Sequence, residues 1–129
     1  MEVKIDTKEK FHVLTIQEPV LPANMTGELS QELLLFLEKD IKNVVLSMHE
    51  VDEIDELAAD ALVTIQQKFY DNNASFVICE INPAVEQYLD KLELLEMINV
   101  TPTESEAWDI VQLEEIEREL IPPDPLKGE

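Results

Sequence analysis

The sequence predicts a single α/β domain with an N-terminal hairpin, a mixed sheet of four to five strands and about four helices. Two observations lead to this fold class. Two extended runs open the chain, and short apolar runs then alternate twice with stretches in which apolar residues recur every three or four positions. This alternation favours parallel strands joined by helical crossovers over a sandwich or a helix bundle.

The hairpin and the first helix are expected in the N-terminal third of the chain. In residues 3–7 and 11–17, Val, Ile and Thr alternate with charged residues, and a polar Lys-Glu-Lys turn lies between the two runs. The following helix should extend to about Lys39, with Asn24 or Thr26 as its cap. Its apolar face consists of Met25, Leu29, Leu33, Phe36 and Leu37.

Two interior strands are expected at 43–48 and 75–81, because both runs are short and almost wholly apolar. The helix between them should begin at Asp55 and end at the Asp-Asn-Asn run 71–73. Asn82-Pro83 is a start signal for a third helix, since Asn caps free amides and Pro suits the first helical position.

The C-terminal part is predicted to contain a last short strand at 97–100 and a fourth helix that a Thr103–Glu106 capping box opens. We expect the stripe Leu113, Ile116 and Leu120 of this helix to pack on the domain or on a second copy, the alternative being a solvated helix. Three prolines follow within five residues, so the domain is placed at 1–120 and a mobile Pro-rich tail at 121–129.

The charge of the chain restricts its partners. Its 129 residues include 9 basic and 29 acidic side chains, a net charge of −20, with 45% hydrophobic residues. Enough apolar material is present for a core, while so negative a chain repels polyanions. We therefore expect no nucleic-acid binding and no membrane insertion, and a basic or apolar protein partner. The single Cys79 and the absence of an apolar leader predict a cytoplasmic protein.

Known catalytic patterns are largely missing. The chain has two glycines, too few for a phosphate loop, and none of its serines lies in a nucleophile elbow. A Cys–His nucleophile of Cys79 with His12 or His49 stays open, although a cysteine in an apolar strand is more often a small buried hydrophobe. The acidic run 50–56 lacks the pattern of a calcium loop. We therefore expect a protein without enzymatic activity that binds no metal and no cofactor.

Three segments carry a resemblance to a known family. The first is the apolar run 43–48, which precedes an acidic loop that ends at Asp55. The second is the strand-to-helix junction 76–85, Phe-Val-Ile-Cys-Glu-Ile-Asn-Pro-Ala-Val. The third contains Leu89, Leu92, Leu94 and Val100. Together they resemble the STAS domain of bacterial anti-sigma factor antagonists and of the cytoplasmic tails of sulphate transporters, which implies a module that works by protein binding.

The departures from the family pattern affect the expected function. Where the family has Ser-Ser-Gly after the aspartate, this chain has Glu56-Leu57-Ala58, and Leu57 stands at the serine that antagonists phosphorylate. Glu18-Pro19-Val20-Leu21 replaces a Gly-Glu-Leu-Asp turn, and Glu93 replaces a glycine. The resemblance implies a non-catalytic regulator without the phosphoacceptor, docking on a partner such as an anti-sigma kinase. The alternative is a constitutive scaffolding or assembly subunit of a transport or signalling complex.

The expected docking site is the start of the second helix and its neighbouring loop. The candidate partner-binding residues are Asp55, Glu56, Leu57, Ala58 and Asp60. Asp55 should cap the helix and leave Glu56 and Leu57 on its exposed first turn, where the helix N-terminus favours a negative charge.

Overall fold

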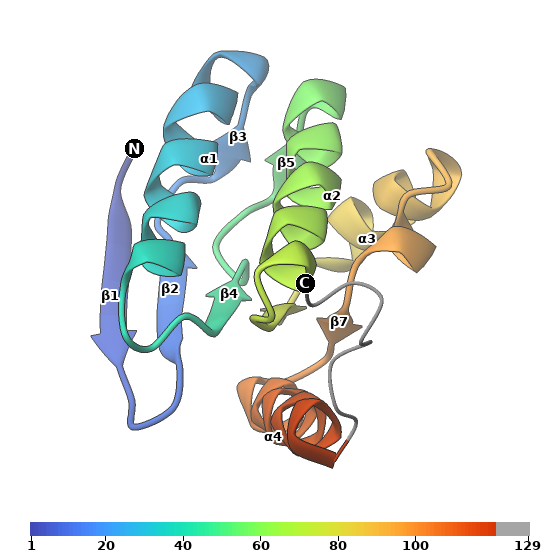
Figure 1. The fold of residues 1–129 in the computed structure, drawn as a ribbon. Coiled ribbons are helices and arrows are strands. Elements are labelled where there is room, and N and C mark those ends of the chain that lie inside the picture. The colour runs from blue at the N-terminus through green and yellow to red at the C-terminus, as the bar shows by residue number, and fades with distance from the viewer. Residues whose placement is uncertain (121–129) are drawn as a thin grey trace.

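The computed structural model describes residues 1–120, and the expected tail 121–129 lies outside the described residues. Figure 1 shows the fold. In chain order, the elements are β1 (Val3–Thr7), β2 (His12–Ile16), β3 (Val20–Leu21), the 3-10 helix η1 (Ala23–Met25), α1 (Thr26–Leu34), η2 (Leu35–Glu38), β4 (Val44–Ser47), β5 (Glu53–Ile54), α2 (Glu56–Asp71), β6 (Phe76–Cys79), α3 (Pro83–Lys91), η3 (Leu95–Met97), β7 (Val100–Thr101) and α4 (Glu104–Leu120).

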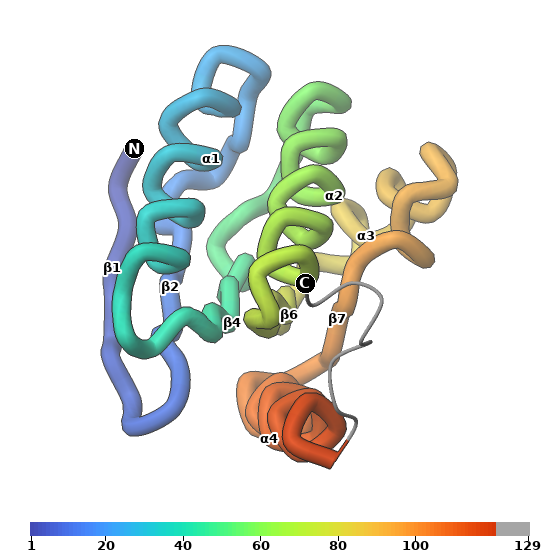
Figure 2. Tube along the Cα trace, viewed as in Figure 1, coloured from blue at the N-terminus to red at the C-terminus, as the bar shows by residue number. Residues whose placement is uncertain are grey.

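The main sheet is mixed and has five strands in the order β1-β2-β4-β6-β7. Strand β1 runs antiparallel to β2, and each further pair is parallel. The chain path in Figure 2 shows the hairpin at one edge and the crossovers that return the chain to each new strand. The predicted α/β class, the hairpin and the mixed sheet are confirmed.

Helices cover both faces of this sheet. On one face, α1 and α2 lie side by side, as Figure 1 shows, and the larger core fills the space beneath them with side chains such as Leu14, Leu46 and Phe76. On the other face, α4 packs against β4, β6 and β7 over a smaller core that includes Val45, Val77 and Cys79. Alternate residues of each buried strand thus serve two different cores.

The helix caps predicted at three positions are present. The side chains of Asp55 and Asn82 accept hydrogen bonds from the amides two residues ahead, and the Thr103 hydroxyl accepts one from the Glu106 amide at 3.1 Å. The cap of the first helix was predicted wrongly. Neither Asn24 nor Thr26 caps it, because η1 precedes α1 and the chain enters α1 from an existing turn of helix.

Two further details differ from the prediction. The last strand is Val100–Thr101 and not 97–100, because Leu95–Met97 form the 3-10 turn η3 first. A second, two-stranded parallel sheet pairs β3 with β5, and the sequence pattern gave no indication of it.

The outer stripe of α4 does not pack on the described part of the domain, so the first of the two expected outcomes was wrong. Ala107 and Val111 form the inward face instead, and the Trp108 ring stacks on Phe11 with 4.8 Å between the ring centroids. Leu113, Ile116 and Leu120 all point to solvent. The other expected outcome, packing of this stripe on a second copy, is not tested by a single chain.

Candidate partner-binding surface

The start of α2 is built around Asp55. Its Oδ1 accepts a hydrogen bond from the Leu57 amide at 2.9 Å, and its carbonyl oxygen accepts one from Ala59. Its own amide donates to the Leu21 carbonyl at 2.9 Å, which ties the cap to strand β3. A cap of this type stabilises a helix by about 1 kcal/mol. The first turn of α2 is therefore fixed both by this cap and by the hydrogen bond from Asp55 to β3.

Four of the five predicted site residues lie at the surface. Asp55, Glu56 and Asp60 are exposed, and the Leu57 side chain is 58% exposed. Ala58 is fully buried in the larger core, where it anchors the first turn from inside and does not face solvent. The exposed surface at the start of α2 therefore consists of one apolar side chain among three carboxylates, and we call it the α2 surface.

The two-stranded sheet of β3 and β5 positions the segment that leads into α2. The Pro19 carbonyl accepts hydrogen bonds from the Asp52 amide at 2.7 Å and from the Glu53 amide at 3.2 Å. Next to these bonds, Val20 of β3 pairs with Glu53 of β5. In the run Glu18-Pro19-Val20-Leu21, which departs from the family turn, Val20 and Leu21 form strand β3. Val20 is partly exposed on it and adds a second apolar side chain near the α2 start.

The electrostatics of this region have one sign. Residues 43–67 contain no lysine or arginine and six carboxylates. The six are Glu50, Asp52, Glu53, Asp55, Glu56 and Asp60. All of them are exposed, and Glu56 sits in the first turn of α2, where the helix dipole favours its charge. A partner that fits this surface has basic side chains around an apolar contact for Leu57.

Of the two histidines that were candidate partners of Cys79, His12 lies at the other end of the strands. His12 lies opposite Val44 at the start of β4, and its ring is hydrogen bonded to the Ile41 carbonyl, whereas Cys79 lies opposite the last residue of β4. Burial, with a smaller effect from Glu80, raises the pKa of the Cys79 thiol to about 12. The thiol is therefore protonated at neutral pH and packs as a small apolar group.

His49 belongs to a polar cluster that sequence reasoning missed. Its Nδ1 lies 3.0 Å from the Ser47 Oγ, which donates to the Glu80 carboxylate at 3.2 Å. The backbone of Glu80 adopts a φ of 56°, in the left-handed region, which no local pattern in the sequence indicates. Ser47 is buried beneath α4, so this cluster fastens the ends of β4 and β6 and offers no open nucleophile.

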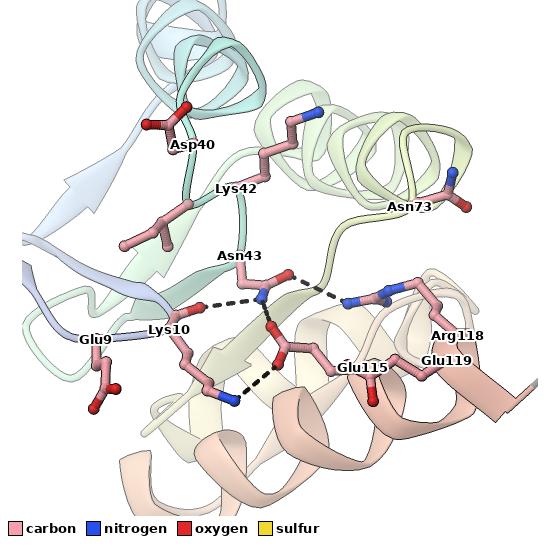
Figure 3. Close-up of a pocket in the computed structure, with 10 residues that line it drawn as sticks. Glu9, Lys10, Asp40, Lys42, Asn43, Asn73, Glu115, Arg118 and Glu119 are labelled. Carbon is pink, nitrogen blue, oxygen red and sulfur yellow. Dashed lines mark hydrogen bonds and ion pairs between the residues drawn. The ribbon is translucent and has the colours of Figure 1, made fainter.

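An open cavity of about 560 Å³ lies at the opposite end of the inner strands, next to the residues that precede β2, β4 and β6. Figure 3 shows that its centre is filled by a polar network in which Asn43 donates to the Lys10 carbonyl and to Glu115 and accepts from Arg118. The charged lining mixes three cations with four carboxylates, and Glu9 and Asp40 point away from the network. Because its central groups satisfy one another, we assign this cavity to the anchoring of α4 and not to ligand binding.

Residues 1–120 contain neither a cluster of metal-ligating side chains nor a helix that could span a membrane. Within this range, no three His, Cys, Asp or Glu side chains gather as metal ligands would. None of the helices described there is long and apolar enough to cross a bilayer.

Comparison with known structures reveals the same fold in several proteins. A variant of RsbS from Moorella thermoacetica matches with a TM-score of 0.74 at 20% identity, over 90% of this chain and 99% of that one. An anti-sigma factor antagonist from Mycobacterium paratuberculosis matches with a TM-score of 0.74 at 14% identity, over 86% and 93%. The murine Slc26a9 anion transporter matches with a TM-score of 0.66 at 15% identity, over 81% of this chain and 18% of the transporter.

These identities establish the fold alone, and a comparison with curated proteins gives no sequence match. The family comparison is more direct, because the STAS domain model matches residues 2–107. This range includes the hairpin, the five-stranded sheet, the α2 surface and the first turn of α4. The chain therefore belongs to the STAS domain family.

Proposed function

We propose that this protein is a non-catalytic regulator that binds a protein partner through the α2 surface and is not switched by phosphorylation there. The observation that carries the proposal is Leu57, which is 58% exposed on the first turn of α2, at the position of the phosphorylated serine in the family pattern. Leucine has no hydroxyl group and accepts no phosphate. Residues 53–60 contain no Ser, Thr or Tyr that replaces it.

The proposed partner is an anti-sigma kinase, which the resemblance to antagonists supports. In a phosphorylated antagonist, the added charge at a helix start changes the affinity for the partner. Here Glu56 supplies one fixed negative charge beside an apolar side chain, so the surface keeps a single electrostatic state. We expect binding that neither ATP nor a phosphatase changes.

Binding is tested by capture from a lysate of the native cell on the immobilised protein, followed by mass spectrometry. We expect capture of an anti-sigma kinase, and loss of capture with Leu57→Arg and with Glu56→Lys. Tyr70→Arg is the matched control, because Tyr70 is an exposed apolar residue at the other end of the same helix. The docking proposal is wrong if both α2-surface variants capture the partner as well as the wild type does.

Phosphorylation is tested with the captured kinase and ATP. We expect no phosphate within residues 53–60 of the wild type and phosphate on the new hydroxyl of Leu57→Ser. Thr64, one turn farther along α2, is exposed and needs separate mass-spectrometric assignment. Phosphorylation of wild-type Thr64 that abolishes binding would contradict a constitutive binding state.

A second candidate function is a constitutive assembly subunit. The fold also matches part of an anion transporter, so a domain of this type occurs within a transport protein. The same capture experiment separates the two functions, because recovery of a membrane transport complex in place of a kinase supports the assembly subunit.

A further inference from the structure

Helix α4 is apolar on two opposite faces, and the sheet uses one of them. The inward face carries Ala107 and Val111, both fully buried in the smaller core. The outward face carries a stripe at three- and four-residue spacing that is 58% exposed at Leu113, 49% at Ile116 and 74% at Leu120. We call these three residues the α4 stripe. An apolar stripe of this kind along a surface helix is the usual mark of helix-to-helix contact.

The surroundings of the α4 stripe are acidic. Its exposed neighbours on the helix are Glu106, Asp109, Glu117 and Glu119. The one basic residue of α4, Arg118, points inward, where it donates to Ser75 Oγ at 3.2 Å and approaches Asn43 Oδ1 at 3.5 Å. The outward face of α4 therefore combines leucine and isoleucine with carboxylates and carries no compensating cation.

We propose that the α4 stripe is a docking surface for a basic amphipathic helix of a protein partner, separate from the α2 surface. The partner's apolar side chains would lie along the stripe, and its lysines or arginines would face the flanking carboxylates. A second copy of this chain fits poorly, because pairing two α4 helices places these carboxylates against one another.

The probe for this surface is a synthetic peptide with leucines at helical spacing on one face and lysines elsewhere. A scrambled peptide of identical composition is the essential control, since a chain of net charge −20 attracts any polycation. We expect the patterned peptide to bind the full chain at least tenfold more tightly than the scrambled one. A tenfold difference corresponds to about the free energy gained when one leucine side chain is buried. NMR shift changes should concentrate on residues 109–120.

The variants separate the α4 stripe from the rest of the surface. Leu113→Ser and Ile116→Ser should each weaken patterned-peptide binding about tenfold, without lowering the melting temperature, because neither side chain is buried. Leu57→Ser removes an equally exposed leucine from the α2 surface and should leave peptide binding unchanged. The proposal is overturned by equal binding of the scrambled peptide, by unchanged binding to both stripe variants, or by a wild-type dimer in sedimentation that Ile116→Ser dissociates.

Discussion

Replacing Glu93 by glycine should raise the free energy of unfolding by about 1 kcal/mol. Glu93 follows the last turn of α3 with a φ of 62°, in the left-handed region. The Leu94 amide donates to the Leu89 carbonyl at 3.0 Å across it, which closes the helix in a Schellman motif. Both leucines are in contact with the larger core, so the turn itself is fixed by packing.

The magnitude follows from two opposing effects. A residue with a Cβ in the left-handed region costs about 1–2 kcal/mol, which glycine does not incur. Glycine loses more chain entropy on folding, and this offsets about 0.5–1 kcal/mol of the gain. The Glu93 side chain is exposed, so its removal leaves no cavity. For a domain of this size, the net gain corresponds to a rise in melting temperature of about 3–5 °C.

Urea unfolding monitored by circular dichroism measures the change, with Glu93→Ala as the matched control. Both variants remove the same charge from a chain of net charge −20, in which the loss of a carboxylate can itself stabilise the fold. Only the glycine variant also removes the Cβ. If Glu93→Ala stabilises the protein as much as Glu93→Gly, the gain comes from charge and the backbone reasoning is refuted.

Three further predictions concern the core, the cysteine and the charge. Asn43→Ala should lower the free energy of unfolding by about 2–3 kcal/mol, because the buried Ser75 amide donates to Asn43 Oδ1 at 2.8 Å and would lose this partner. A loss within the error of urea unfolding would contradict this. Between pH 8 and 10 the free energy of unfolding of the wild type should fall by about 1.5 kcal/mol relative to that of Cys79→Ala, because the thiol ionises in the unfolded chain while it keeps its proton in the folded one. Parallel pH profiles of the two proteins would refute this. Labelled DNA or RNA should show no shift with micromolar protein at physiological salt, and a salt-sensitive shift would count against it.

Local chemistry explains which elements could be predicted from the sequence. The caps Asp55, Asn82 and Thr103 act on amides two or three residues away, so the signal and its effect lie in the same short segment. The interior strands could be recognised because both of their faces are buried, which requires a continuous apolar run. By contrast, β3 and β5 are two residues long and are held by bonds such as Asp52 to Pro19, between segments about thirty residues apart. No periodicity is visible at that length.

The orientation of α4 could not be predicted from the sequence for a different reason. Helical spacing reveals two apolar faces, and Leu113, Ile116 and Leu120 lie on the face that the sheet does not use. The small Ala107 lets the helix approach the strands closely, while Arg118 and Glu115 bond to groups at the beginnings of β2, β4 and β6. Because these anchors come from elements far apart in the chain, the sequence alone could not select the buried face. The same limit applies to Ala58, which adjoins exposed Leu57 yet belongs to the core.

The positions of the two proposed surfaces make them independent of each other. The α2 surface follows the carboxyl end of β4 and begins a helix on one face of the sheet. The α4 stripe lies on the other face, in the half of α4 that is anchored where β4 and β6 begin. No side chain belongs to both, so patterned-peptide affinity should be equal with and without a partner on the α2 surface. Equal affinities would describe a fixed adaptor that holds two partners at once, whereas unequal affinities would show that the two surfaces are coupled and would contradict their independence.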